Sequence, residues 1–93
     1  MKVASTRSDH FVVQGEEFTM VKRPNQLRRI ARRMPTRTYE EKVAYLRAII
    51  TASTLPADHE RMRPLIDKIP YPTLVMVARW MIEQNHLVPR HAS

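Results

Sequence analysis

The apolar positions of this sequence recur at helical spacing over most of its length. Between residues 24 and 34 they follow an i, i+3, i+4, i+7 pattern, carried by Leu27, Ile30, Ala31 and Met34. At 100° per residue they fill an arc of about 100°, which predicts an amphipathic helix. Pro35 ends it, because the residue before a proline avoids the α region. About ten residues form too short a helix to be stable alone, so its apolar side must dock on the domain.

A second helix is predicted to run from residue 39 to about Ala52. Thr38 precedes it and Glu41 follows three residues later, the spacing of a capping box. Residues 53–56, which end in a proline, break this helix. Its expected apolar stripe consists of Tyr39, Val43, Leu46 and Ile50, widened by Tyr45 and Ile49.

The third segment, residues 57–69, repeats the helical pattern although Pro64 lies inside it. Either the helix kinks at Pro64, or it begins near Arg61, so that the proline falls in the first turn at little cost. The apolar positions of this segment are Met62, Leu65, Ile66 and Ile69.

Residues 69–72 then predict a rigid, extended connector containing Pro70 and Pro72, whose peptide bonds are expected to be trans, with a cis bond as the alternative. The last helix is predicted to start at Pro72 or Thr73 and to run to about Leu87, before Pro89. Its broad apolar face indicates the central helix of the core. That face comprises Leu74, Val75, Val77, Ala78, Met81 and Ile82.

Near the N-terminus, two runs of β-branched and aromatic residues flank Gly15 and Glu16, which favours a β-hairpin with a type II′ turn at these two residues. The predicted fold is therefore mainly α: a bundle of three to four short helices with a short N-terminal hairpin or extended arm. We expect residues 1–9 to form a flexible tail, residues 10–89 one small helical domain, and residues 90–93 a second tail.

The chain has 93 residues and a net charge of +7, and this charge is concentrated in one segment. No acidic residue lies between Glu17 and Glu40, and outside residues 22–37 nine basic residues balance nine acidic ones. Arginine suits bidentate contacts with phosphates or carboxylates. The basic residues of the segment are Lys22, Arg23, Arg28, Arg29, Arg32, Arg33 and Arg37.

Two interpretations of this segment compete with a merely solvated surface. The first is a small non-enzymatic regulator that binds nucleic-acid phosphates through residues 22–37. The second is a phage- or plasmid-type modulator that docks on an acidic surface of a larger protein, such as a host nucleic-acid-processing enzyme. A helix-turn-helix is disfavoured, because the segment after residues 53–56 is close to neutral and the break contains no glycine.

The last helix carries a second candidate patch, made of Met76, Arg79 and Trp80. Such a combination is typical of a protein-interaction hot spot, and an exposed tryptophan could also stack on a base. The alternative, which we favour, is that Trp80 packs half-buried against the hairpin or against Tyr71.

Other functional classes find little support in the sequence. It has no cysteine and only one glycine, its histidines lack metal-ligand spacing, and no apolar run is long enough for a membrane span. Asp58, His59 and Glu60 point about 100° apart on a helix, so the two acids are expected to favour its N-terminus rather than to catalyse. We predict a cytoplasmic protein that is not an enzyme, without metal, cofactor or small-molecule substrate, and for which a homodimer is an open alternative.

Overall fold

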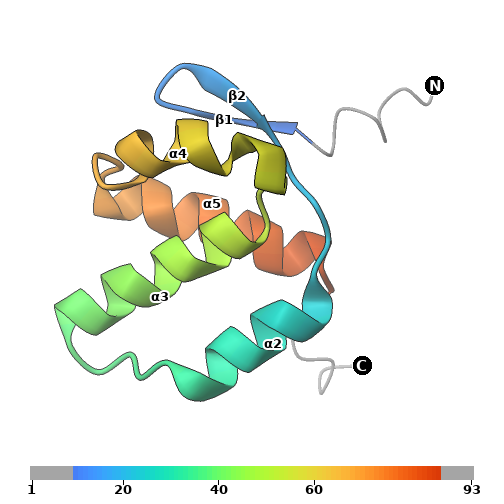
Figure 1. Cartoon of the computed structure of the whole chain (residues 1–93). Helices are drawn as coiled ribbons and strands as arrows, with labels where there is room; N and C mark the ends of the chain where they lie inside the picture. The colour runs from blue at the N-terminus through green and yellow to red at the C-terminus, as the bar shows by residue number, and fades with distance from the viewer. Residues whose placement is uncertain (1–9, 87–93) are drawn as a thin grey trace.

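The computed structural model describes residues 10–86, which form an N-terminal hairpin followed by helices (Figure 1). The predicted small helical bundle with a hairpin is confirmed. The elements are β1 (His10–Val13), β2 (Glu16–Thr19), α2 (Pro24–Arg33), α3 (Tyr39–Ala52), the 3₁₀ turn η1 (Pro56–Asp58), α4 (His59–Ile66) and α5 (Tyr71–Gln84).

The hairpin turns one residue earlier than the sequence suggested. Val13 pairs with Glu16, so the loop consists of Gln14 and Gly15. Their φ angles of 51° and 80° are both positive, as a type I′ turn requires, so the predicted type II′ turn at Gly15 and Glu16 is wrong. The observed register places Phe11 opposite Phe18, with ring centroids 5.7 Å apart. The earlier turn therefore sets the register that brings Phe11 and Phe18 together.

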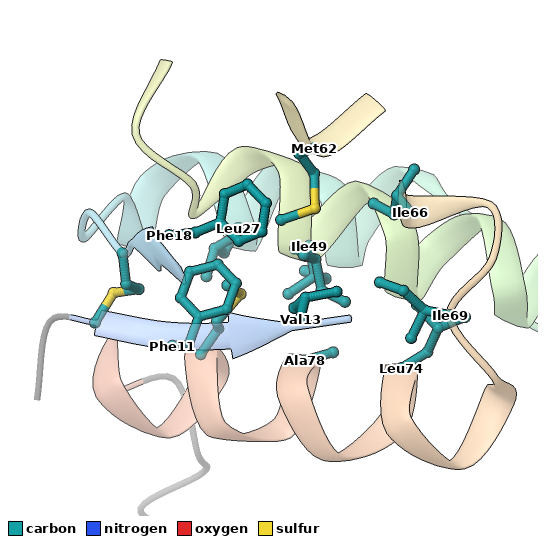
Figure 2. Close-up of a cluster of buried hydrophobic side chains, with 13 residues drawn as sticks. Phe11, Val13, Phe18, Leu27, Ile49, Met62, Ile66, Ile69, Leu74 and Ala78 are labelled. Carbon is teal, nitrogen blue, oxygen red and sulfur yellow. The ribbon is translucent and has the colours of Figure 1, made fainter. Parts of the chain in front are cut away.

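Side chains from both strands and all four α-helices meet in one hydrophobic core (Figure 2). The largest contact between helices is that of α3 with α5, which agrees with the predicted central position of the last helix. In Figure 2, β1 runs alongside α5, and its residues Phe11 and Val13 are buried in the core. The buried apolar residues are Phe11, Val13, Phe18, Met20, Leu27, Ile49, Ile50, Met62, Ile66, Ile69, Leu74, Ala78 and Met81.

The chain between β2 and α2 runs alongside the residues that follow α3. The Val21 N–H donates to the Ser53 carbonyl at 2.8 Å, and the Leu55 N–H donates to the Thr19 carbonyl at the same distance. Between these bonds, Met20 pairs with Thr54 as an isolated antiparallel bridge. This pairing fixes the path by which the chain leaves the hairpin and approaches α2.

The boundaries of α2 and α3 agree with the prediction, and the capping box is confirmed. The Glu41 N–H donates to Thr38 Oγ1 at 3.1 Å, and the Thr38 N–H donates to Glu41 Oε1 at 3.0 Å. A start of the third helix near Arg61 is wrong, because η1 leads directly into α4 at His59. Pro64 is therefore an interior residue of α4 rather than part of its first turn.

The last helix, α5, begins at Tyr71 and ends at Gln84, earlier at both ends than expected. Its end is set by Asn85, whose Nδ2 donates to the Met81 carbonyl at 2.7 Å, and by His86, which adopts a left-handed φ of 57°. The expected stop at Leu87 and Pro89 lies outside the described residues. No cis peptide bond occurs within residues 10–86, so the expected trans bonds at Pro70 and Pro72 are confirmed.

Asn85 also joins the end of α5 to the start of α2. It is buried, and its Oδ1 accepts a 2.7 Å hydrogen bond from the backbone N–H of Arg23, the N-cap residue of α2. Arg23 makes no side-chain capping bond of its own. The start of α2 is therefore anchored by a side chain that lies 62 positions later in the sequence.

Asp58 and Arg61 join η1 and α4 to the hairpin. Asp58 Oδ2 accepts from the Thr19 N–H at 3.2 Å, and its Oδ1 pairs with Arg61 at 3.1 Å. Arg61 also pairs with Glu16 at 3.2 Å and lies 4.5 Å from the Phe18 ring centroid. As expected, Asp58 is the N-cap residue of α4 and Glu60 lies in its first turn, where the helix dipole favours negative charge. The Asp58 carboxylate makes no capping hydrogen bond, because it reaches β2 instead.

These contacts shift the pKa values of both Asp58 and Arg61. The hydrogen bond from Arg61, with a second from the Thr19 N–H, holds the pKa of Asp58 below its ordinary value of 3.8. In return, the Asp58 carboxylate raises the pKa of Arg61. Each ion is stabilised in its charged form by the fold.

The lowered pKa of Asp58 predicts an acid-sensitive tertiary contact. The carboxylate contributes stability above pH 3.8, and this contribution is lost as the pH falls through the lower pKa of the folded state. Urea unfolding followed by circular dichroism between about pH 2 and pH 7 measures it. Asp58→Asn is expected to lower the urea midpoint at neutral pH and to flatten its fall at acidic pH.

The matched control is Glu60→Gln, because Glu60 pairs with Arg63 at 3.5 Å on the exposed side of α4. Exposed pairs contribute little, so this variant should keep the wild-type acid profile. An Asp58→Asn profile that parallels the wild type at every pH would contradict the assignment.

Asn85→Ala is expected to lower the free energy of unfolding by about 1–3 kcal/mol, because it leaves the Arg23 N–H without its acceptor. Hydrogen exchange should be faster in α2 than the global loss of stability explains, since the anchor of that helix is removed. Asn25→Ala, at an exposed asparagine whose Oδ1 accepts from the Arg28 side chain, is the control. Equal losses for the two variants would refute the anchoring role.

Candidate nucleic-acid interface

Helix α2 lies at the end of the molecule opposite the hairpin and packs beside α3 (Figure 1). Leu27 is fully buried, and Ile30 and Met34 are half-buried. Ala31, the fourth residue of the predicted apolar stripe, is exposed. The stripe that docks α2 is therefore narrower than its sequence suggested, because only one neighbouring helix covers it closely.

The opposite side of α2 presents four exposed arginines to solvent. Arg28 and Arg32 form one row along the helix, and Arg29 and Arg33 form the next row, since residues four apart lie one above the other. Arg32 and Arg33 also lie in the last turn, where the helix dipole favours positive charge. Lys22, Arg23 and Arg37, which flank the helix, are exposed as well. We call these seven residues together the basic surface: Lys22, Arg23, Arg28, Arg29, Arg32, Arg33 and Arg37.

Within residues 10–86, none of the seven cations of the basic surface forms an ion pair with a carboxylate. Arg28 Nη1 donates to Asn25 Oδ1 at 3.0 Å, which is a contact with a neutral amide. Glu41, four residues after Arg37, uses Oε1 to accept from the backbone N–H groups of Arg37 and Thr38. It caps α3 instead of neutralising a guanidinium.

The ion pairs that the structure does contain lie elsewhere. Around α4 and the hairpin, Arg61 pairs with Asp58 and Glu16, and Arg63 pairs with Glu60. Where α3 meets the end of α4, Arg47 pairs with Asp67 at 3.4 Å. The arginines around α4 are therefore balanced by neighbouring acids, whereas those of α2 are not. The positive charge that was concentrated in the sequence is also concentrated in space.

The second predicted patch, on α5, is only partly exposed. Met76 is 68% exposed and Arg79 is exposed, but Trp80 is half-buried. The Trp80 ring centroid lies 5.9 Å from that of Phe11, which confirms the expected packing on the hairpin. The hairpin thus covers part of the side of α5 that carries this patch.

The sequence did not predict an aromatic pair that lies near the α2–α3 loop. Tyr39, predicted as part of the apolar stripe of α3, is 62% exposed, so that prediction is wrong. Its ring centroid lies 5.3 Å from that of Tyr71, at an interplanar angle of 39°. Tyr39 is the first residue of α3 and projects beyond the core, and Tyr71 is the first residue of α5. Their contact depends on how the two helix starts are placed.

Asp58, His59 and Glu60 do not converge on a common point. Asp58 contacts Thr19 and Arg61, His59 Nε2 donates to the Thr54 carbonyl at 2.9 Å, and Glu60 pairs with Arg63. Each side chain has a separate structural contact.

Over residues 10–86, no three acidic or histidine side chains gather in an arrangement that could hold a metal ion. No helix in the same range has the length and apolar character needed to cross a membrane. The chain was compared with known protein families, with curated proteins and with solved structures, and no match was found.

Proposed function

We propose that this protein is a small basic nucleic-acid-binding regulator whose basic surface contacts backbone phosphates. The observation that supports this proposal is the group of seven exposed cations, none of them paired with a carboxylate within the described part of the chain. Phosphates bind such a surface by releasing the counterions that screen them. Arginine adds bidentate hydrogen bonds to this electrostatic attraction.

The size of α2 fits a backbone contact. Its ten residues span about 15 Å at 1.5 Å per residue, and its four arginines occupy two adjacent rows. Lys22 and Arg37 extend the positive charge beyond both ends of the helix. We infer a non-enzymatic role, in which binding affects access to the nucleic acid.

A modulator that docks on a larger protein is the second candidate. The exposed Met76 beside Arg79 on α5 favours it, because methionine and arginine are enriched at protein interfaces. A nuclease-treated pull-down separates the two candidates. A stoichiometric protein partner that remains after nuclease treatment and is lost with Met76→Ser supports the modulator, whereas loss of every partner supports nucleic-acid binding.

The leading proposal predicts binding that weakens steeply with salt. Replacing Arg28, Arg29, Arg32 and Arg33 together by Gln is expected to reduce the slope of log affinity against log salt by roughly three, at 0.7–0.9 per phosphate contact. The four single replacements should weaken binding by similar amounts and for every sequence. Fluorescence anisotropy with labelled oligonucleotides across a salt series measures both effects.

Arg63→Gln is the control, since Arg63 is an exposed arginine on α4 that pairs with Glu60. It should leave the affinity and the salt slope close to those of the wild type. Binding that does not depend on salt, or that survives replacement of all four α2 arginines, would refute the proposal.

A further inference from the structure

Beside the basic surface, the structure places an aromatic side chain in solvent. Tyr39 is 62% exposed, and Tyr71 supports its ring at a centroid distance of 5.3 Å. Burial of an aromatic ring is favourable, so an exposed ring held in a defined position by a second ring forms a platform that can stack on a planar ligand. Two helix starts hold this platform, which makes it part of the folded domain rather than of a loop tip.

The Tyr39 platform opens onto a shallow hollow along α3. The hollow has a volume of about 290 Å³ and is lined by Tyr39, Glu40, Val43, Ala44 and Arg47. Residues 39, 43 and 47 are four apart and so form one row on the helix. An aromatic ring at one end and aliphatic side chains along the floor offer a surface for a flat, partly apolar group.

The charges around the hollow indicate how such a group would be oriented. Arg37 is exposed and only two residues before Tyr39, so the two Cα atoms are no more than about 7.6 Å apart. Glu40 lines the hollow and would repel a phosphate there. Arg47 is already paired with Asp67. Phosphate is therefore favoured at Arg37 and the basic surface, and a neutral ring is favoured at Tyr39.

We propose that the ligand of this protein is single-stranded nucleic acid, and that one of its bases stacks on Tyr39 while its backbone follows the basic surface past Arg37. This inference rests on the proposed function and specifies it. A base in a duplex is already stacked on both faces and has no face to offer Tyr39. An unpaired base has a free face that can stack on Tyr39. Base–aromatic stacking beside a positively charged surface is how proteins bind single strands without sequence preference.

The experiment compares two probes that carry the same phosphates. One is a labelled oligodeoxythymidine of about a dozen nucleotides, and the other is an abasic strand of the same length, which keeps the backbone but has no bases. Wild-type protein is expected to bind the oligodeoxythymidine more tightly than the abasic strand, by about five- to a hundredfold. Tyr39→Ala should remove this preference without changing the salt slope, and Tyr39→Phe should retain it.

Tyr39→Ala should fold, because Tyr39 is mostly exposed, and thermal unfolding verifies this. Tyr45→Phe, a conservative change at a half-buried tyrosine of the same helix, should leave the preference unchanged. A wild-type protein that binds both strands equally, or a Tyr39→Ala variant that keeps the preference, would overturn the stacking inference while leaving phosphate binding intact. Absence of salt-dependent binding to either strand would overturn the single-strand inference, and absence of such binding to a duplex of the same length as well would overturn the proposed function itself.

Discussion

The arrangement of this protein depends on the docking of one short, highly charged helix. With ten residues, α2 is too short to persist in water without tertiary contacts. Leu27 is its only fully buried residue, and burying a leucine side chain contributes about 1.5–3 kcal/mol. The Asn85–Arg23 hydrogen bond adds a polar anchor at the start of the helix. The side opposite Leu27 therefore stays in solvent, and the four arginines are held there in fixed rows.

The same residue type has two different roles in this chain, and the position of the acids decides between them. Arg61 is surrounded by Glu16, Asp58 and the Phe18 ring, so its charge is used to hold the hairpin against α4. The arginines of α2 have no carboxylate partner within residues 10–86. Charges that are compensated inside a fold add to its stability, whereas uncompensated charges on one face create a field that reaches beyond it.

Tyr39 is a residue whose exposure in the fold differs from what its position in the apolar pattern predicts. Its spacing is that of a core position of α3, but it is the first residue of that helix and is 62% exposed. Ile49 and Ile50, near the other end of the same helix, are buried. Distance from the core along the helix, which the sequence pattern does not contain, separates these residues.

Features that depend on near neighbours along the chain can be predicted from the amino-acid sequence alone. The extents of α2 and α3, the Thr38–Glu41 capping box and the presence of a hairpin follow from periodicity, capping and turn chemistry within a few residues. The confinement of the net charge to residues 22–37 can also be counted directly from the sequence.

Features that join distant residues depend on how the elements pack against one another. Arg23 and Asn85 are 62 positions apart, and Asp58 reaches the Thr19 N–H across 39 positions. The exact turn of the hairpin, the covering of Trp80 by Phe11 and the Tyr39–Tyr71 contact likewise require elements to be placed against each other. Local spacing specifies which side of an element is apolar, but which neighbour covers that side is settled only when the whole chain packs around a single core.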